Sequence, residues 1–248
     1  MFEMCTDWVR ENTEYEVVGG YLSPVSDAYK KQGLAPAHHR LEMCRLAALE
    51  SGWIMVDPWE ASKKEYTRTA LVLDHLQHEI NEVRGGIETV NGERRIAKVA
   101  LLSGADLIQT MSEPGVWSQQ DLDHILGRYG GFIIERSGTD MGKALESLSR
   151  WRENIYPIPQ LVTNDVSSTK VRNFLRKDMS IRYDGRNLLL SNHSLTRLAR
   201  YLIPDAALKY IDEHNLFKPE QPPGIPRTNS YNSSTQKSTD GVKVTNGA

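Results

Sequence analysis

The stretch IAKVALLSGADLI, residues 96–108, is a continuous apolar run that we expect to form a strand buried on both faces of a sheet. Fully apolar strands of this kind are typical of parallel sheets whose two faces are covered by helices. Helical patterns are predicted on both sides of it, at residues 65–82 and 118–129, the second ending at Gly130 and Gly131. The stretch therefore predicts an α/β fold.

The rest of the chain repeats this alternation. Strands are predicted at 14–24, 53–59, 132–136 and 155–162, and helices at 1–13, 39–51 and 141–154. Strands that alternate with helices of this length form right-handed βαβ units and a mostly parallel, doubly wound sheet. Such sheets bind ligands at the carboxyl ends of their strands. The loops SPVSDAYKK, SGADL and TNDVSSTKVR, each of which follows a strand, are therefore the candidate site.

The bulk properties restrict the partners. The 248 residues include 30 Lys and Arg against 32 Asp and Glu, a formal net charge of -2, which argues against a general nucleic-acid or membrane-surface binder. Cys5 and Cys44 have no CxxC spacing, which favours a reducing compartment over a disulfide framework or a zinc site. We also find no membrane-length apolar run and no secretory signal pattern at the start.

Residues 164–174, NDVSSTKVRNF, indicate a phosphate site. Residues that cap helix N-termini gather here, namely Asp165, Ser167, Ser168 and Thr169, and apolar positions at helical spacing follow them. Lys170 and Arg172 then fall in or near the first turn, where the helix dipole disfavours each cation by about 0.3 to 1 kcal/mol. A bound polyphosphate would reverse that sign. The alternative is that Asp165 simply caps the helix and both cations are solvated.

For other candidate residues a purely structural role is at least as common as a functional one. Gly104 permits close approach of a ligand, and Asp106 could accept from a hydroxyl or could serve as an N-cap. Taken alone, Lys30 and Lys31 indicate a solvated pair of charges. Trp117 indicates either a core residue or a surface on which a planar ring stacks. The histidines at 38, 39, 75 and 78 carry no recognisable catalytic or metal partner, and we expect His75 and His78 to lie on a partly exposed helix face. Neither a P-loop nor GxGxxG is present.

Four blocks in this order resemble the eukaryotic, plant-like nicotinamide/nicotinic acid mononucleotide adenylyltransferases: GYLSPVSDAYKKQGLAPAHHR, WE with KEYTRT, LLSGADLIQTMSEPGVW and NDVSSTKVRNFLRKDMSIRY. The resemblance runs from residue 1 to about residue 217 and implies a Rossmann-like nucleotidyltransferase fold. It implies transfer of the adenylyl group of ATP to nicotinamide or nicotinate mononucleotide with Mg²⁺ bound through the ATP phosphates, giving NAD or deamido-NAD and pyrophosphate. It also implies a cytosolic or nuclear location and allows a homo-oligomer.

The resemblance assigns roles residue by residue. Lys31 and Arg172 would act on the phosphates. The mononucleotide would meet Tyr66, Thr69, Gly104, Asp106, Val116 and Trp117, with Arg136 near the adenosine side. ATP would meet Asn164, Ser167, Ser168, Thr169, Lys170 and Arg172. Tyr66 stands where many members have Trp, a conservative change for a stacking surface.

Three departures qualify these implications. The family begins with a strand and a G-x-F-x-P…H turn whose histidine contacts ATP phosphates, and this sequence shows neither, so a central strand is expected to be missing. An insertion is predicted at 184–200, and a disordered tail at 218–248 follows a domain of residues 1–217. An alternative transcript or an imperfect gene model would produce such a chain. The alternative function is therefore a catalytically inactive nucleotide-binding or interaction protein, and an adenylyltransferase for another phosphate acceptor also stays open.

Overall fold

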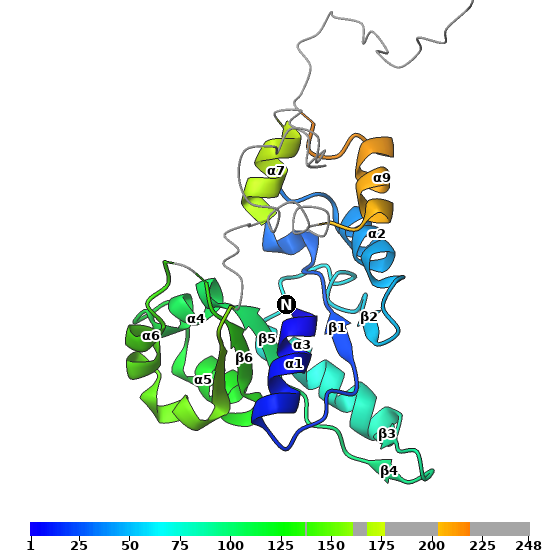
Figure 1. Ribbon diagram of the computed structural model, residues 1–248. Coiled ribbons are helices and arrows are strands. Elements are labelled where there is room, and N and C mark those ends of the chain that lie inside the picture. The colour runs from blue at the N-terminus through cyan, green and yellow to red at the C-terminus, as the bar shows by residue number, and fades with distance from the viewer. Residues whose placement is uncertain (137, 161–167, 177–202, 219–248) are drawn as a thin grey trace, which may run out of the picture. The chain divides into compact units, whose positions relative to one another are not determined.

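The computed structural model describes residues 1–136, 138–160, 168–176 and 203–218, all within one compact unit, Met1–Lys218. Figure 1 shows helices and short strands alternating along the chain. The strands are β1 (Gly20–Leu22), β2 (Ile54–Val56), β3 (Ile87–Glu88), β4 (Arg94–Arg95), β5 (Leu101–Gly104), β6 (Gly131–Ile134) and β7 (Ile155–Ile158). The α-helices are α1 (Phe2–Asn12), α2 (Ala37–Ala48), α3 (Thr69–His78), α4 (Ala105–Ser112), α5 (Gln119–Leu122), α6 (Met141–Ser147), α7 (Ser168–Arg176) and α9 (Asp205–Glu213). Shorter helical turns are η1 (Asp27–Tyr29), η2 (Glu79–Val83), η3 (Asp123–Tyr129) and η4 (Ser149–Asn154). The predicted α/β class is confirmed.

The parallel pairing predicted from the alternation is also confirmed. Strands β5, β6 and β7 form one parallel sheet in that order, with Leu101 opposite Gly131 and Gly131 opposite Ile155. Strands β1 and β2 form a second parallel pair, with Gly20 opposite Ile54. Among the described strands no ladder joins these two sheets. The expectation of a missing central strand stays a prediction.

Helix α1 connects the two sheets through its apolar face. Cys5 and Val9 are buried with Ile134 and Ile158, which end strands β6 and β7. At the other end of α1, the ring of Phe2 lies so close to β1 that a Cβ on Gly20 would approach it to 2.7 Å. A side chain at Gly20 would therefore push α1 away from the smaller sheet.

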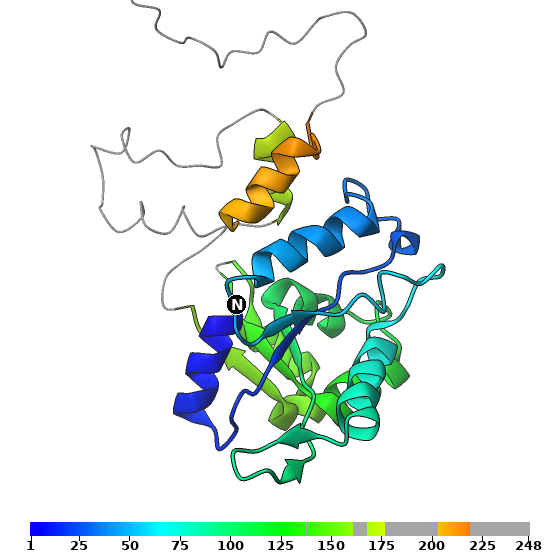
Figure 2. The same cartoon turned by 90° about the vertical axis from the view of Figure 1, so that its right-hand side faces the viewer.

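The main core lies on the other side of the larger sheet. It contains Ile133 and Ile155 from the strands and fully buried side chains from α4 and η3, including Ile108, Ile125 and Leu126. Figure 2 shows helices on both sides of the strands. None of the helices in the described ranges has the length and apolarity needed to cross a bilayer.

Two predicted boundaries were wrong for identifiable reasons. The strand expected at 96–108 ends at Gly104, because Ala105, Ile108 and Met111 recur at helical spacing and bury one face of α4. The helix expected from residue 65 begins at Thr69. The carbonyl of Glu65 instead accepts a hydrogen bond from the hydroxyl of Ser26, so this carbonyl does not take part in the hydrogen bonds of the helix.

Two more elements differ from the prediction. The polar turn around VNGERR is flanked by the antiparallel strands β3 and β4, with Gly92 at a φ of 77°. The helix expected at 141–154 is divided at Leu148, so that α6 is followed by the tighter turns of η4. Leu148 is buried in the main core, which indicates that packing decided this change of helix type.

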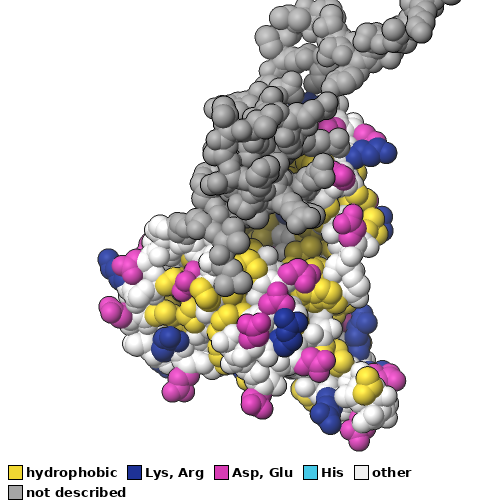
Figure 3. Space-filling view, viewed as in Figure 1, with side chains coloured by type: hydrophobic (Ala, Val, Ile, Leu, Met, Phe, Trp, Pro, Cys, Tyr) yellow, Lys and Arg dark blue, Asp and Glu magenta, His cyan; other side chains and the backbone are white. Residues whose placement is uncertain are grey.

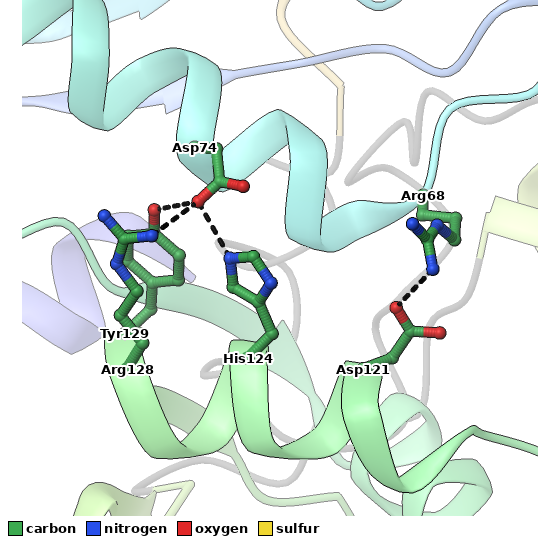
Figure 4. A network of polar contacts seen from close by, with 6 residues as sticks. All are labelled: Arg68, Asp74, Asp121, His124, Arg128 and Tyr129. Atoms are coloured by element: carbon green, nitrogen blue, oxygen red, sulfur yellow. Dashed lines mark hydrogen bonds and ion pairs between the residues drawn. The ribbon is translucent and has the colours of Figure 1, made fainter.

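Asp74 fastens α3 to η3 by a cluster of hydrogen bonds (Figure 4). Its Oδ1 accepts from the hydroxyl of Tyr129 at 2.5 Å and from Nη1 of Arg128 at 3.2 Å, and it lies 2.8 Å from Nε2 of His124. Burial alone would raise the pKa of Asp74, but the bonds from Tyr129 and His124 lower it below its ordinary value.

The insertion predicted at 184–200, the capping residue Asp165 and, apart from Lys218, the tail predicted from residue 218 lie outside the described residues. The domain boundary at 217 stays a prediction.

Candidate functional site

Two loops that follow parallel strands form the best-defined part of the site. Residues 23–36 follow β1 and residues 57–68 follow β2, so both loops leave the carboxyl edge of the same sheet. The first carries Lys31, and the second carries Tyr66 and leads to Thr69 at the start of α3. Three predicted site residues therefore belong to one edge: Lys31, in a loop that the alternation of strands and helices indicated, and Tyr66 and Thr69, which the resemblance assigned.

Polar and aromatic contacts hold the two loops together. The hydroxyl of Ser23 donates to Oε2 of Glu60 at 3.0 Å. The same two loops are also joined by the stacked rings of Tyr29 and Tyr66, with centroids 5.8 Å apart and planes 21° from parallel. Both rings are exposed, Tyr29 to 43% and Tyr66 to 53%, so they offer an aromatic surface at the mouth of the site.

A cationic surface pocket of about 330 Å³ lies within the first loop. It is lined by Ser26, Asp27, Lys30, Lys31, Leu34, Ala35, Pro36 and Arg40. Arg40 from α2 shapes it by donating to the carbonyls of Val25 and Ala35 and to Oδ1 of Asp27. Lys31 is exposed beside this pocket, as its predicted phosphate role requires.

Helix α7 brings further cations to the same loop. A Cβ on Gly33 would lie 2.5 Å from Nη2 of Arg176, so the guanidinium rests against the backbone that follows Lys31. Arg172 donates to Oγ1 of Thr169 at 3.2 Å, and no acidic residue occupies the first turn of α7. Burial and the charge of Arg176 lower the pKa of Arg172, as expected where cations gather.

The structure describes only part of the predicted ATP site. Ser168 and Thr169 begin α7 and are exposed. The predicted residues Asn164 and Ser167, and the side chain of Lys170, lie outside the described residues.

The turn from β5 into α4 carries two predicted residues, Gly104 and Asp106. Among the described residues, no atom lies within 4 Å of the position that a Cβ on Gly104 would take. Asp106 lies in the first turn of α4, and its Oδ2 accepts from Nη1 of Arg136 at 2.8 Å. The N-cap of α4 is Gly104, so Asp106 is not the cap. Asp106 and Arg136, predicted separately, are thus direct neighbours.

Trp117 is held against the main core. Its Nε1 donates to Oγ1 of Thr110 at 3.1 Å, and its ring packs on the buried cluster while staying partly exposed. Val116 beside it is 56% exposed. The core interpretation accounts for this placement, and the role of Trp117 as a stacking platform stays a prediction.

Residues 57–75 contain a cluster that the sequence did not indicate. His75 is partly exposed, as expected, with 15% of its side chain accessible, and its ring stacks on that of Trp59, with centroids 4.2 Å apart and planes 6° from parallel. Its Nε2 lies 3.2 Å from Oδ2 of Asp57, the residue that follows β2. The contacts with Trp59 and Asp57 were not predicted, because both residues are distant from His75 in the sequence. His78 is exposed and pairs with Glu82, as expected.

Glu60 and Tyr29 were also missed as individual residues, although both lie within the blocks WE and DAYKK. Glu60 is 6% exposed, and burial raises the pKa of its carboxyl. Across the described chain no group of three His, Cys, Asp or Glu side chains is arranged to hold a metal ion.

Comparison with known proteins identifies the family. Residues 4–174 match the cytidylyltransferase-like family. The chain is 51% identical over 221 residues to nicotinamide/nicotinic acid mononucleotide adenylyltransferase 2 of Saccharomyces cerevisiae, covering 88% of this chain and 51% of that protein. It is 35% identical to nicotinamide/nicotinic acid mononucleotide adenylyltransferase 1 of Bos taurus, covering 89% of this chain and 83% of the relative, and 35% identical to the Arabidopsis thaliana enzyme, covering 88% and 82%.

These matches also qualify the resemblance. A fungal relative at 51% identity and plant relatives at 35 to 36% do not confirm the plant-like character expected from the motifs. The chain spans about half the length of the yeast relatives that it matches. The match of residues 4–174 and the coverage of the bovine and Arabidopsis relatives nonetheless show that this chain belongs to the cytidylyltransferase-like family, and within it to the nicotinamide/nicotinic acid mononucleotide adenylyltransferases.

Proposed function

We propose that this chain transfers the adenylyl group of ATP to nicotinamide or nicotinic acid mononucleotide, giving NAD or deamido-NAD and pyrophosphate. The observation that carries the proposal is the contact between the two loops, which sets the stacked rings of Tyr29 and Tyr66 beside the cationic pocket of Lys30 and Lys31. A mononucleotide needs both features, an aromatic surface for its base and cations for its phosphate.

The transfer needs no covalent enzyme intermediate. A phosphate oxygen of the mononucleotide attacks the α-phosphorus of ATP, the new P–O bond forms, and the bond to the β-phosphate bridging oxygen breaks to release pyrophosphate. Catalysis of such a step rests on alignment and on stabilisation of charge at the phosphates. Lys31 and Arg172 are the cations that we assign to this role, and the loop contacts provide the alignment.

The base side of the acceptor would meet Tyr66, Thr69, Val116 and Trp117, and the ribose side Gly104 and Asp106. Arg136, which pairs with Asp106, connects this side to the adenosine side. Asn164, Ser167, Ser168, Thr169 and Lys170 stay proposed ATP contacts. Mg²⁺ would arrive on the ATP phosphates, which supply its oxygen ligands.

Acceptor selectivity tests the proposal. Pyrophosphate release from ATP should require nicotinamide or nicotinic acid mononucleotide, and ribose 5-phosphate, which has the phosphate but no ring, should not replace either. Tyr66→Ala should lower turnover with the mononucleotide by about tenfold, the usual scale for loss of one aromatic contact. A control substitution, Tyr15→Ala, removes an exposed tyrosine outside both loops. Equal rates with ribose 5-phosphate would contradict the proposal and favour another phosphate acceptor.

A cytosolic or nuclear location and assembly into a homo-oligomer also remain proposals, which fluorescent tagging and light scattering of the purified chain test separately.

A further inference from the structure

Glu60 is an unusual residue for its position. Among the buried residues of the described chain it is the one with a carboxyl, amino, guanidinium or imidazole group, at 6% exposure. Its partner is a neutral hydroxyl, that of Ser23, at 3.0 Å. Burial of this carboxyl raises its pKa, and the bond from Ser23 and the positive charge of Arg40 offset that rise only in part. Stability therefore does not account for the presence of Glu60.

The place of Glu60 in the fold suggests what it provides. Ser23 directly follows β1 and opens the loop that carries Lys31. Glu60 lies in the loop after β2, which carries Tyr66. The Ser23–Glu60 bond therefore joins the two loops at their base, close to the strands, while the stacked tyrosines join them at the exposed end.

We propose that Glu60 is a positioning residue for the acceptor mononucleotide, which it serves by holding the loop of Lys31 in register with the loop of Tyr66 through Ser23. A mononucleotide that places its phosphate at Lys31 and its base at Tyr66 must touch both loops at once. An error in their relative position weakens both contacts together. This inference rests on the proposed function for the identity of the ligand.

Direct binding measurements on the full chain test the inference independently of turnover. Titration calorimetry with nicotinamide mononucleotide and, separately, with ATP compares Glu60→Ala, Ser23→Ala and the double variant with the unaltered chain. Each single variant should weaken mononucleotide binding by about tenfold, the scale of a hydrogen bond to a charged group, and leave ATP binding within about twofold. The double variant should bind no worse than either single variant, because both remove the same bond.

Two further variants separate positioning from general damage. Glu60→Gln keeps an oxygen that can accept from Ser23 and should restore mononucleotide affinity. Ser62→Ala is the matched control, because the hydroxyl of Ser62 donates only within its own loop, to the carbonyl of Trp59 at 2.8 Å. If Glu60→Ala fails to fold, Ser23→Ala and Glu60→Gln still decide the question.

Mononucleotide affinities of Ser23→Ala and Glu60→Ala equal to that of Ser62→Ala would overturn the inference, as would an equal loss of ATP binding or additive effects in the double variant. Dinucleotide formation is measured on the same samples. If the variants show the expected binding pattern but no dinucleotide forms, the proposed function is contradicted and the inference stands. If dinucleotide forms but the binding pattern is missing, the inference is contradicted and the proposed function stands.

Discussion

One carboxylate oxygen of Asp74, on α3, accepts hydrogen bonds from three residues of η3, and this one residue therefore links the two elements. Asp74→Ala should lower the free energy of unfolding by about 1 to 3 kcal/mol, because the hydroxyl of the buried residue Tyr129 loses its acceptor. Urea unfolding followed by circular dichroism measures this change. Asp7→Ala, which removes an exposed pair with Arg10, should cost less than about 0.5 kcal/mol. Equal costs for the two variants would show that the cluster contributes nothing.

The raised pKa of Glu60 predicts how the stability of the folded chain changes with pH. Its pKa is raised in the folded chain, so its contribution to stability is fully present below the unfolded pKa and is lost as pH rises through the folded pKa. Glu60→Gln cannot ionise and should therefore gain stability over the unaltered chain as pH increases from about 4 to 8. Thermal unfolding of both chains across this range measures the difference. A difference that stays constant with pH would contradict the assignment.

Arg172 gives a prediction for ATP. Its guanidinium lies one turn from the exposed start of α7 and donates to Thr169. Arg172→Ala should weaken ATP binding by about tenfold, the scale of one charge-assisted hydrogen bond to phosphate. Calorimetry measures the affinity, with Arg10→Ala as the control because Arg10 lies on α1 and pairs with Asp7. Unchanged ATP affinity in Arg172→Ala would contradict the assignment of α7 to the ATP site.

Helix α9 docks on α2 through a group of histidine and tyrosine rings. Nδ1 of His39 lies 2.8 Å from the hydroxyl of Tyr210, and the rings of His38 and His214 lie beside His39. The pKa of His39 is lowered, first by burial and then by the charges of His38 and His214. A lowered pKa means that the stabilising contribution is present above the unfolded pKa of His39 and is lost as pH falls through its folded value.

We therefore expect α9 to lose protection before the rest of the chain as pH falls below about 6.5. Hydrogen exchange, corrected for intrinsic rates, measures protection of residues 205–213 against that of β6 as an internal control. His39→Phe keeps an aromatic ring, cannot ionise and should weaken this pH dependence. Parallel loss of protection in α9 and β6 would contradict local undocking.

Elements whose packing follows local periodicity were predictable from the sequence. The apolar positions of α1 indicated a helix, and Ser118 before α5 caps it as its residue type suggests, accepting from the backbone N–H of Asp121. Boundaries set by distant partners were not predictable. The hydroxyl of Ser26 binds the carbonyl of Glu65, and α3 begins later than predicted. The ring of Trp59 covers that of His75. Neither contact is indicated by the sequence around the residues that make it.

For the site too, features with a local sequence pattern were predictable, and contacts between distant segments were not. The loop that carries Lys31 was identified because a parallel sheet places the loops after its strands at one edge, whereas Tyr66 was identified through the resemblance to the family. The Ser23–Glu60 bond and the pairing of Asp106 with Arg136 depend on how separate segments approach each other in space, which residue types alone do not specify. On the face seen in Figure 3, acidic, basic and apolar side chains are interspersed over the part of the surface that the structure describes.

Label transfer from ATP tests the central claim most directly. The purified chain is incubated with Mg²⁺, nicotinamide mononucleotide and ATP labelled either at the α- or at the γ-phosphorus, and the products are separated by chromatography. Adenylyl transfer predicts the α label in a dinucleotide and the γ label in pyrophosphate, in equal amounts. An α label that stays in ATP or appears only in AMP, while both substrates bind, would contradict adenylyl transfer and favour a nucleotide-binding protein without turnover.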